Sequence, residues 1–218
     1  MIKVPHLVQY QGSKRNLAPI IAKYFPDVIN RFIEPFSGTG AMSIYTATYG
    51  LCQSFVLNDV NGQITNLLDK CINSPDELAT KYEEIWKEQF EEGENSVDYY
   101  YKMRNKFNAI KDTPDPALTL FILARVAKGA VRYNQTGEMN QICDRRRQGT
   151  RPDTIRKNAP TIIIRRSGNG YASNLYRRGT ALSQNALPPV SEPARRRHGD
   201  HQPAGDLESA QGLRALYF

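Results

Sequence analysis

Residues 32 to 40 read Phe-Ile-Glu-Pro-Phe-Ser-Gly-Thr-Gly, and Asp59 follows a second apolar stretch, residues 54–57. The first stretch predicts a short strand that runs into a loop with glycines at 38 and 40, after which a helix begins. In an α/β sheet, such glycines let backbone N–H groups approach a ligand closely, and an acidic residue after the next strand accepts hydrogen bonds from ribose hydroxyls. The pattern predicts a site for a nucleoside-containing cofactor.

The glycine spacing narrows the class of cofactor. The third glycine of the dinucleotide fingerprint is replaced by Ser43, and no Gly-Lys-Ser/Thr phosphate loop occurs. A lone Gly-x-Gly is also compatible with an ordinary strand-to-helix turn. The flanking Glu34-Pro35-Phe36 and the placing of Asp59 favour the cofactor site. A cofactor without phosphate groups needs no lysine in the loop, and S-adenosylmethionine fits that description.

Composition limits the class of protein and of partner. The chain has 218 residues, enough for one domain or a domain with a subdomain, and its net charge of +7 favours a polyanionic partner. The three cysteines have neither metal-ligand nor disulfide spacing, so we expect reduced thiols, a cytoplasmic protein and no metal. The longest apolar stretch, around 118–131, contains Arg125 and Lys128, and we therefore expect no membrane span.

The order of elements changes character near residue 74. Before that point the pattern predicts helices at 16–24, 41–49 and 64–72 and strands at 31–36 and 55–58. After it the apolar spacing predicts three helices, at 76–92, at 100–110 and at 116–131. Trp86 and residues 99–101 are interpreted as packing residues of this helical insertion in preference to a ligand site.

Residues 132 to 157 form a polar and basic segment, expected as a loop or hairpin. Its cations are Arg132, Arg145, Arg146, Arg147, Arg151, Arg156 and Lys157. A run of charge is usually a solvated face. Here the cations alternate with Tyr133, Asn134, Gln135 and Asn140, side chains that can read base edges or fill a gap in a base stack. We therefore favour a contact with nucleic acid.

Three separated blocks together identify a family. The first is Tyr10-Gln11-Gly12-Ser13-Lys14, and the second joins Glu34-Pro35-Phe36-x-Gly38-x-Gly40 to Asn58-Asp59-Val60-Asn61. The third is Arg132-Tyr133-Asn134-x-x-Gly137-Glu138-Met139-Asn140. In this order, over roughly residues 8–158, they resemble the Dam-like DNA adenine-N6 methyltransferases, whose third motif is Arg-x-Asn-x-x-Gly-x-Phe-Asn. Met139 stands where the family usually has Phe.

The resemblance implies a role for each matching residue. Lys14 would bind the methionine carboxylate of the cofactor, and Tyr10 would offer its ring to the sulfonium or the adenine. The loop residues Glu34, Pro35, Phe36, Gly38 and Gly40 would belong to the cofactor site, with Asp59 on the ribose. On double-stranded DNA, Tyr133 and Asn134 would act beside a flipped adenine, with Asn140 in the same motif. Arg132, Arg145, Arg147 and Arg151 would grip phosphates.

The family's catalytic motif, Asp-Pro-Pro-Tyr, does not occur in the sequence, so no catalytic residue is assigned. The only Pro-Pro is Pro188-Pro189, flanked by Leu187 and Val190. From residue 165 onward lysine disappears and the composition becomes rich in Arg, Gly, Pro and Ser, which predicts disorder over much of 159–218. This tail is either a basic arm for DNA or, as we favour, sequence foreign to the family, read out of frame or joined by a rearrangement.

These observations predict an α/β chain with an incomplete methyltransferase (Rossmann-like) sheet and a helical target-recognition insertion. The divisions expected are 1–74 for part of the α/β domain, 75–158 for the recognition region and 159–218 for the tail. We expect a monomeric, site-specific adenine methyltransferase, either solitary or paired with a restriction enzyme, with GATC as the family's commonest target. The missing motif predicts impaired transfer, and the alternative is an inactive remnant that binds cofactor and DNA. A dehydrogenase is disfavoured by the absent third glycine and by the Arg-Tyr-Asn block.

Overall fold

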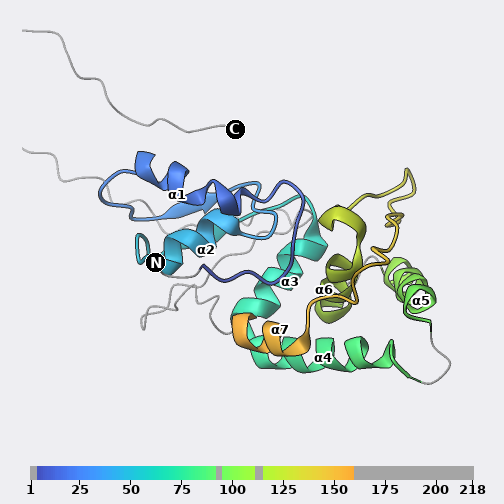
Figure 1. Cartoon of the computed structure of the whole chain (residues 1–218). Helices are drawn as coiled ribbons and strands as arrows, with labels where there is room; N and C mark the ends of the chain where they lie inside the picture. Colours follow the sequence, from blue (N-terminus) through green and yellow to red (C-terminus); the bar gives the residue numbers. More distant parts are fainter. Residues whose placement is uncertain (1–3, 92–94, 111–114, 160–218) are drawn as a thin grey trace, which may run out of the picture. The chain divides into compact units, whose positions relative to one another are not determined.

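The structure, a computed structural model, describes residues 4–91, 95–110 and 115–159 (Figure 1). Its elements are the 3₁₀-helices η1 (Lys14–Asn16), η2 (Ala22–Tyr24) and η3 (Ala127–Gly129), the strands β1 (Phe32–Glu34) and β2 (Phe55–Leu57), and the helices α1 (Ala18–Ile21), α2 (Ala41–Thr48), α3 (Gly62–Asn73), α4 (Pro75–Glu88), α5 (Ser96–Ala109), α6 (Pro116–Arg125) and α7 (Pro152–Asn158).

Strands β1 and β2 form a parallel pair with α2 as the connection between them. Phe32 lies opposite Phe55, and Glu34 lies opposite Leu57. Parallel strands need a crossover connection, and α2 supplies one that packs against β1. Because both strands run in one direction, the turns that follow them meet at the same edge of the sheet. The two motif segments that the sequence indicated are thereby brought together.

The helices begin at residues whose side chains or rings suit a helix N-terminus. Asn61 accepts a hydrogen bond from the backbone N–H of Gln63 at the start of α3, and Asn95 does the same for Val97 in α5. Asp115 accepts from two N–H groups of α6, and α4, α6 and α7 each have proline in the first turn. Such caps satisfy N–H groups that have no partner inside the helix.

Helix α6 lies at the centre of the helical part. It packs against α3, α4 and α5, and its residues from Ala117 to Leu123 are all buried. Tyr82 of α4 and Tyr99 and Tyr100 of α5 are buried with it, and Trp86 packs at the margin of the same core. The prediction that these aromatic residues pack in a core is confirmed.

A fully buried arginine ends α6. Arg125 is 1% exposed, and its guanidinium donates to the carbonyl oxygen of Ser96, at 2.6 Å, and to that of Arg147. A third contact runs to Sγ of Cys143 at 3.4 Å. One side chain thus ties the start of α5 to the segment that follows the hairpin.

Two predicted helices differ from the structure. Residues 14–24 form a four-residue α-helix between two 3₁₀ turns, where one helix was expected over 16–24. The helix expected over 116–131 ends at Arg125, because Val126 is extended and pairs with Cys143 in an antiparallel bridge. Lys128 and Gly129 then take positive φ angles of 60° and 62°, which a continuing helix excludes.

Helix α7 lies within the segment that was expected to be a loop or hairpin. Pro152 fixes the first turn, and Ile155 is buried where α7 packs against α4. Apart from Ala159, the expected tail, 159–218, lies outside the described residues. Among the described helices, none combines the length and the apolar character that crossing a membrane requires.

Apolar side chains of the N-terminal part are unusually exposed. Ile33 of β1 is 60% exposed and Phe36 is 76% exposed, and Tyr24 and Val28 are similarly open. In the described residues β1 pairs with β2 alone, so its second edge carries no strand. The sheet is therefore a two-stranded parallel unit in a mixed helix and strand fold.

The close packing at Gly129 provides a test of the link between the N-terminal segment and the turn after α6. A Cβ atom at Gly129 would lie 2.6 Å from the carbonyl oxygen of Gln9, and Gln11 N donates to Gly129 O at 2.7 Å. We expect Gly129→Ala to lower the free energy of unfolding by about 2–4 kcal/mol, because a positive φ and a backbone clash add. Urea unfolding followed by circular dichroism measures this loss.

Gly137→Ala is the matched control for that substitution. Gly137 also has a positive φ, 77°, but no atom lies within 4 Å of an added Cβ. We expect a loss of about 1 kcal/mol from backbone strain alone. Equal losses in the two variants would contradict the packing of residues 9–11 on the turn.

Candidate functional site

The carboxylate of Asp59 joins the turns that follow β1 and β2. One oxygen accepts a hydrogen bond from the backbone N–H of Gly38 at 2.8 Å, and the other accepts from Asn61 N at 2.9 Å. Backbone bonds reinforce the junction, since Ser37 N donates to Asn58 O at 2.8 Å and Asn58 N donates to Glu34 O at 2.9 Å. Residues that lie some twenty positions apart in sequence therefore form one structural unit.

The glycines of the first turn are required by conformation and by packing. Gly38 and Gly40 have φ angles of 49° and 69°, in the left-handed region that residues other than glycine disfavour. A Cβ atom at Gly38 would come within 3.3 Å of the Tyr10 ring, and one at Gly40 would come within 3.2 Å of Leu57. Tyr10 thus lies directly on the glycine turn. Burial and the nearby Asp59 carboxylate raise the pKa of Tyr10, which keeps its phenol neutral.

Glu34 is used inside the fold. Its carboxylate accepts hydrogen bonds from the Ser43 hydroxyl at 2.6 Å, from Ser43 N at 3.0 Å and from Met42 N at 3.4 Å. Burial raises the pKa of Glu34, and the bonds from Ser43 oppose that rise. A carboxylate that accepts from first-turn N–H groups stabilises the helix start. The structure places Glu34 as the cap of α2, whereas the sequence suggested a direct cofactor contact.

A cavity of about 390 Å³ opens beside the glycine turn. Tyr10 and Ser13 line it from the N-terminal segment, and Thr39 and Ala41 line it from the turn and α2. Apolar side chains of α2 and α3 complete the lining, namely Ile44, Ile64, Leu67 and Leu68. The volume lies within the range of about 300–1,000 Å³ that is usual for small-molecule sites.

Three other predicted cofactor residues lie on the surface. Lys14 is exposed at the start of η1, and its Nζ donates to Gly12 O at 3.1 Å. Phe36 is open to solvent, and Pro35 is exposed with its carbonyl bonded to Asn58 Nδ2 at 3.0 Å. The structure therefore brings together Tyr10, Gly38 and Asp59, but of the predicted cofactor residues Tyr10 alone lines the cavity, and neither Gly38, Asp59 nor the Phe36 ring does.

Residues 132–140 form a tight antiparallel hairpin, here called the recognition hairpin. Tyr133 pairs with Met139, and Asn140 N donates to Arg132 O at 3.1 Å. The Asn134 side chain organises the turn, because its Oδ1 accepts from Thr136 N at 3.0 Å and from Glu138 N at 2.8 Å. The hairpin predicted from the sequence is present, and Asn134 helps to shape it.

The base of the hairpin is fixed to α5. Asn108 donates to Met139 O at 3.0 Å and accepts from Met139 N at 2.9 Å, so its amide pairs with that backbone as a strand would. Met139 is buried, and its sulfur lies 4.0 Å from the Tyr100 hydroxyl. Methionine adapts well to such irregular spaces, which accounts for its presence where the family usually has Phe.

Tyr133 reaches from the hairpin to the second turn of the α/β part. Its hydroxyl donates to Gln63 Oε1 at 2.6 Å and accepts from Asn61 Nδ2 at 3.0 Å. The ring is 38% exposed, and burial raises the pKa of its hydroxyl to about 12. Tyr133, which the sequence analysis assigned to DNA, thus bonds Asn61, two positions after Asp59 in the sequence. Neither Asn61 nor Gln63 was assigned a role from sequence, and a contact over 72 residues gives no local signal.

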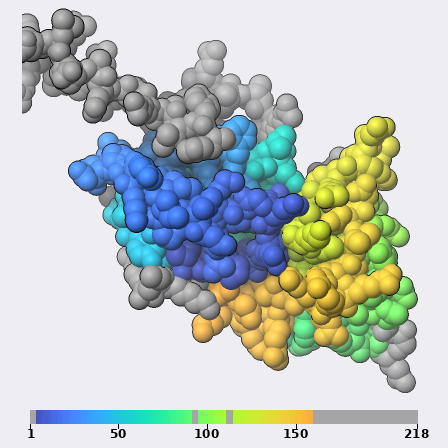
Figure 2. Space-filling model, turned by 45° about the horizontal axis from the view of Figure 1, so that its top comes forward, coloured from blue at the N-terminus to red at the C-terminus, as the bar shows by residue number. Residues whose placement is uncertain are grey.

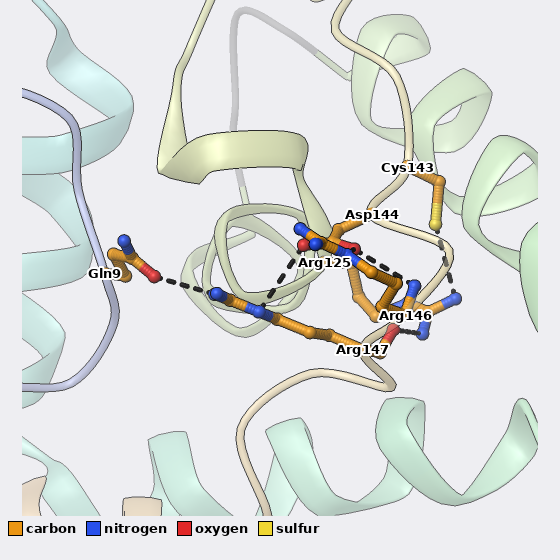
Figure 3. A network of polar contacts seen from close by, with 6 residues as sticks. All are labelled: Gln9, Arg125, Cys143, Asp144, Arg146 and Arg147. Atoms are coloured by element: carbon orange, nitrogen blue, oxygen red, sulfur yellow. Dashed lines mark hydrogen bonds and ion pairs between the residues drawn. The ribbon is translucent and has the colours of Figure 1, made fainter.

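Some arginines after the hairpin are engaged in polar contacts, which Figure 3 shows for Arg146 and Arg147, and others are open to solvent. Arg147 pairs with Asp144 at 3.4 Å and donates to Gln9 Oε1 at 2.7 Å, and Arg146 also pairs with Asp144. These arginine contacts hold the pKa of Asp144 below its usual range, mainly through bonds from Arg146. Arg145, like Arg132 and Arg151, is exposed.

The engaged side chains link the N-terminal segment to the part that follows α6. In Figure 2 the dark blue N-terminal residues lie against the yellow and orange residues, in agreement with the bonds of Gln9 and Gln11 to Arg147 and Gly129. The structure thus gives Arg147 a role inside the fold, where the sequence suggested a phosphate contact.

A second, more open cavity of about 460 Å³ lies between α5 and the hairpin. Arg104, Asn105 and Asn108 line it from α5, and Asn134 and Asn140 line it from the hairpin. The sequence interpretation treated α5 only as a packing helix. The signal that it passed over is a polar stripe of Arg and Asn beside the buried face of α5, where Arg104 and Tyr100 donate to the same carbonyl oxygen of Gln141.

Comparison with known proteins places these features in a family. The family model for D12 class N6 adenine-specific DNA methyltransferases matches residues 10–175. The chain is 30% identical over 134 residues to a protein of Haemophilus influenzae named DNA adenine methylase. The matched residues make up 61% of this chain and 44% of the relative. The type II methyltransferase M1.LlaDCHI of Lactococcus lactis subsp. cremoris is 26% identical over 147 residues, 64% of this chain and 47% of the relative.

A third relative comes from an archaeon. The type II methyltransferase M.MjaIII of Methanocaldococcus jannaschii is 25% identical over 149 residues, 64% of this chain and 52% of the relative. The chain spans about half the length of the curated relatives it matches. The family model includes the glycine turn, Asp59 and the recognition hairpin. The chain belongs to the family of D12 class N6 adenine-specific DNA methyltransferases.

Proposed function

We propose that this chain binds S-adenosylmethionine at the turns after β1 and β2 and takes part in the methylation of adenine N6 in double-stranded DNA. The observation that carries the proposal is the junction of Gly38 and Asp59 beneath the ring of Tyr10, in a chain of the adenine methyltransferase family. In this proposal residues 1–74 hold the methyl donor and residues 75–158 hold the DNA.

The residues at the junction suit S-adenosylmethionine. Each carboxylate oxygen of Asp59 can accept a second hydrogen bond beside the one from backbone N–H, so ribose hydroxyls find acceptors there. Tyr10 offers an aromatic face that attracts a positive sulfonium group. Lys14, one turn further along, is the cation that we assign to the methionine carboxylate. S-adenosylmethionine supplies an electrophilic methyl group, and these residues bind and orient it.

The DNA side of the proposal rests on the hairpin and the open arginines. Arg132, Asn134 and Asn140 are exposed on the hairpin, and Arg145 and Arg151 are exposed beyond it. An enzyme that modifies a base within a duplex must extrude the base, because its exocyclic amine is otherwise paired. We assign the arginines to phosphates and the hairpin to the gap beside the flipped adenine.

A second candidate function is binding of cofactor and DNA without transfer. It is favoured by one observation, namely that the printed sequence contains no Asp-Pro-Pro-Tyr to accept hydrogen bonds from the adenine amine. The two functions share every contact described above. They differ only in whether a methyl group reaches the DNA.

Transfer of tritiated methyl groups from S-adenosylmethionine to a GATC duplex separates the two functions. Label in this duplex, and none in a duplex already methylated at that adenine N6, supports the methyltransferase. Salt-sensitive DNA binding and S-adenosylmethionine binding without label support the binding function. Saturable binding of NAD with no binding of S-adenosylmethionine would exclude both.

Asp59→Asn tests the cofactor site. Asparagine replaces one carboxylate oxygen with an NH2 group, which cannot accept hydrogen bonds from Gly38 N or from ribose hydroxyls. A hydrogen bond to a charged group contributes about 1.5–3 kcal/mol. We therefore expect the Kd for S-adenosylmethionine to rise about tenfold to a hundredfold in isothermal titration calorimetry. Asp69→Asn, an exposed position on α3 that bonds Asn73, is the control and keeps the native Kd. Unchanged affinity in the Asp59 variant contradicts the site.

Arg145→Ala and Arg147→Ala test which arginines contact phosphates. Removing one phosphate contact reduces the slope of log Kobs against log salt by about 0.9. We expect that reduction for Arg145, which is exposed, when duplex binding is followed by fluorescence anisotropy between 50 and 200 mM salt, about the range over which such contacts are measured.

Arg147→Ala is expected to behave differently, because Arg147 is bonded to Gln9 and Asp144. Its substitution should lower the unfolding midpoint and leave the salt slope within error of the native value. A reduced slope in the Arg147 variant together with a native slope in the Arg145 variant reverses the assignment.

A further inference from the structure

The hydroxyl of Tyr133 connects the recognition hairpin to the turn after β2, residues 58–61, here called the cofactor turn. It donates to Gln63 Oε1 and accepts from Asn61 Nδ2, at 2.6 and 3.0 Å. A hydroxyl that both donates and accepts is held in one direction, since both of its roles are filled by fixed partners. The side chain is therefore fixed on the first turn of α3.

The two partners of Tyr133 are themselves fixed by the cofactor turn. Asn61 N donates to Asp59, whose other oxygen accepts from Gly38 N. Asn61 Oδ1 accepts from Gln63 N and caps α3. A continuous chain of hydrogen bonds thus runs from the glycine turn through Asp59 and Asn61 to Tyr133.

Hydrogen bonds within the hairpin connect Tyr133 to the residues at the hairpin tip. Asn134, the next residue, binds across the turn to Glu138 N, and Arg132 O accepts from Asn140 N. The other strand is anchored through Met139 to Asn108 of α5. The Tyr133 hydroxyl adds a support to the hairpin at the other end, where it bonds Asn61 and Gln63 of the cofactor turn and α3.

We propose that Gln63 is a positioning residue that holds the recognition hairpin on the cofactor turn through Tyr133, so that filling the cofactor site strengthens DNA binding. The inference rests on the proposed function and adds a coupling between its two sites. A ligand on Asp59 orders the turn that carries Asn61 and Gln63, and an ordered hairpin loses less conformational freedom when it meets DNA. Linkage requires that DNA strengthens cofactor binding by the same factor.

The coupling is measured on the full chain with S-adenosylhomocysteine, which cannot donate a methyl group, and a GATC duplex at one fixed salt concentration. The Kd for the duplex is determined by anisotropy with and without saturating S-adenosylhomocysteine, and the reverse titration is made by calorimetry. We expect the native protein to bind the duplex at least about fivefold more tightly when S-adenosylhomocysteine is present, the lower end of usual coupling factors.

Gln63→Leu and Gln63→Glu form the matched pair. Leucine removes the acceptor for the Tyr133 hydroxyl, and glutamate keeps one at a helix position where negative charge is favourable. The coupling factor should fall to about one in the leucine variant and stay native in the glutamate variant. Tyr133→Phe removes the same bond from the other side, keeps the ring, and should match the leucine variant.

The outcomes distinguish the coupling from the proposed function. A native factor in both Gln63→Leu and Tyr133→Phe, or a factor of one or below in the native protein, overturns the coupling while leaving both binding sites intact. If the native protein binds neither S-adenosylhomocysteine nor DNA, the proposed function fails, and the coupling with it. If Gln63→Leu unfolds below 37 °C, about the working limit for such titrations, the Tyr133→Phe result decides alone.

Discussion

The carboxylate of Asp59 is the constraint on which the candidate site depends. It holds Gly38 and Asn61 at once, and thereby fixes both the glycine turn and the start of α3. Helix α3 in turn packs against α6, the most buried helix of the described residues. A single acidic residue therefore relates the cofactor turns to the helical part. Each of its two oxygens can accept a further hydrogen bond, because each N–H uses only one lone pair.

The helical part has its own internal tie, the buried guanidinium of Arg125. A buried cation is costly unless its donors find acceptors, and here carbonyl oxygens of Ser96 and Arg147 and the Cys143 sulfur accept from the two terminal nitrogens, while Nε has no partner. These groups belong to α5 and to the segment after the hairpin. Arg125 thus ties the segment after the hairpin to α5, and the hairpin itself is held by Asn108 at Met139 and by Tyr133 at Asn61 and Gln63. Both supports end at backbone or side-chain groups that are fixed by helices.

Local signals in the sequence were sufficient for the elements near the cofactor turns. The apolar stretches, the glycines and Asp59 predicted the strand–turn–helix unit, because each depends on neighbours a few residues away. Helix α2 begins and ends close to the predicted bounds, with Gly50 at a positive φ after it. The family resemblance drawn from the three motif blocks is confirmed by the family match.

What the sequence did not indicate depends on distant partners. The bonds of Glu34 to the start of α2 were not predicted, because they require the helix to be in place. The bond of Arg147 to Gln9 was not predicted either, because the two residues lie 138 positions apart. The end of α6 at Arg125 follows from the pairing of Val126 with Cys143, again a tertiary contact. Helix propensity alone predicts that the helix continues beyond Arg125.

The most direct test of the central claim is a crystal structure of the chain with S-adenosylhomocysteine. The account predicts that the ribose hydroxyls lie within hydrogen-bonding distance of Asp59 and that the adenosine or the thioether lies against Tyr10, with Gly38 beneath. Electron density for the ligand at another surface, with no ligand at the turns that contain Gly38 and Asp59, would contradict it.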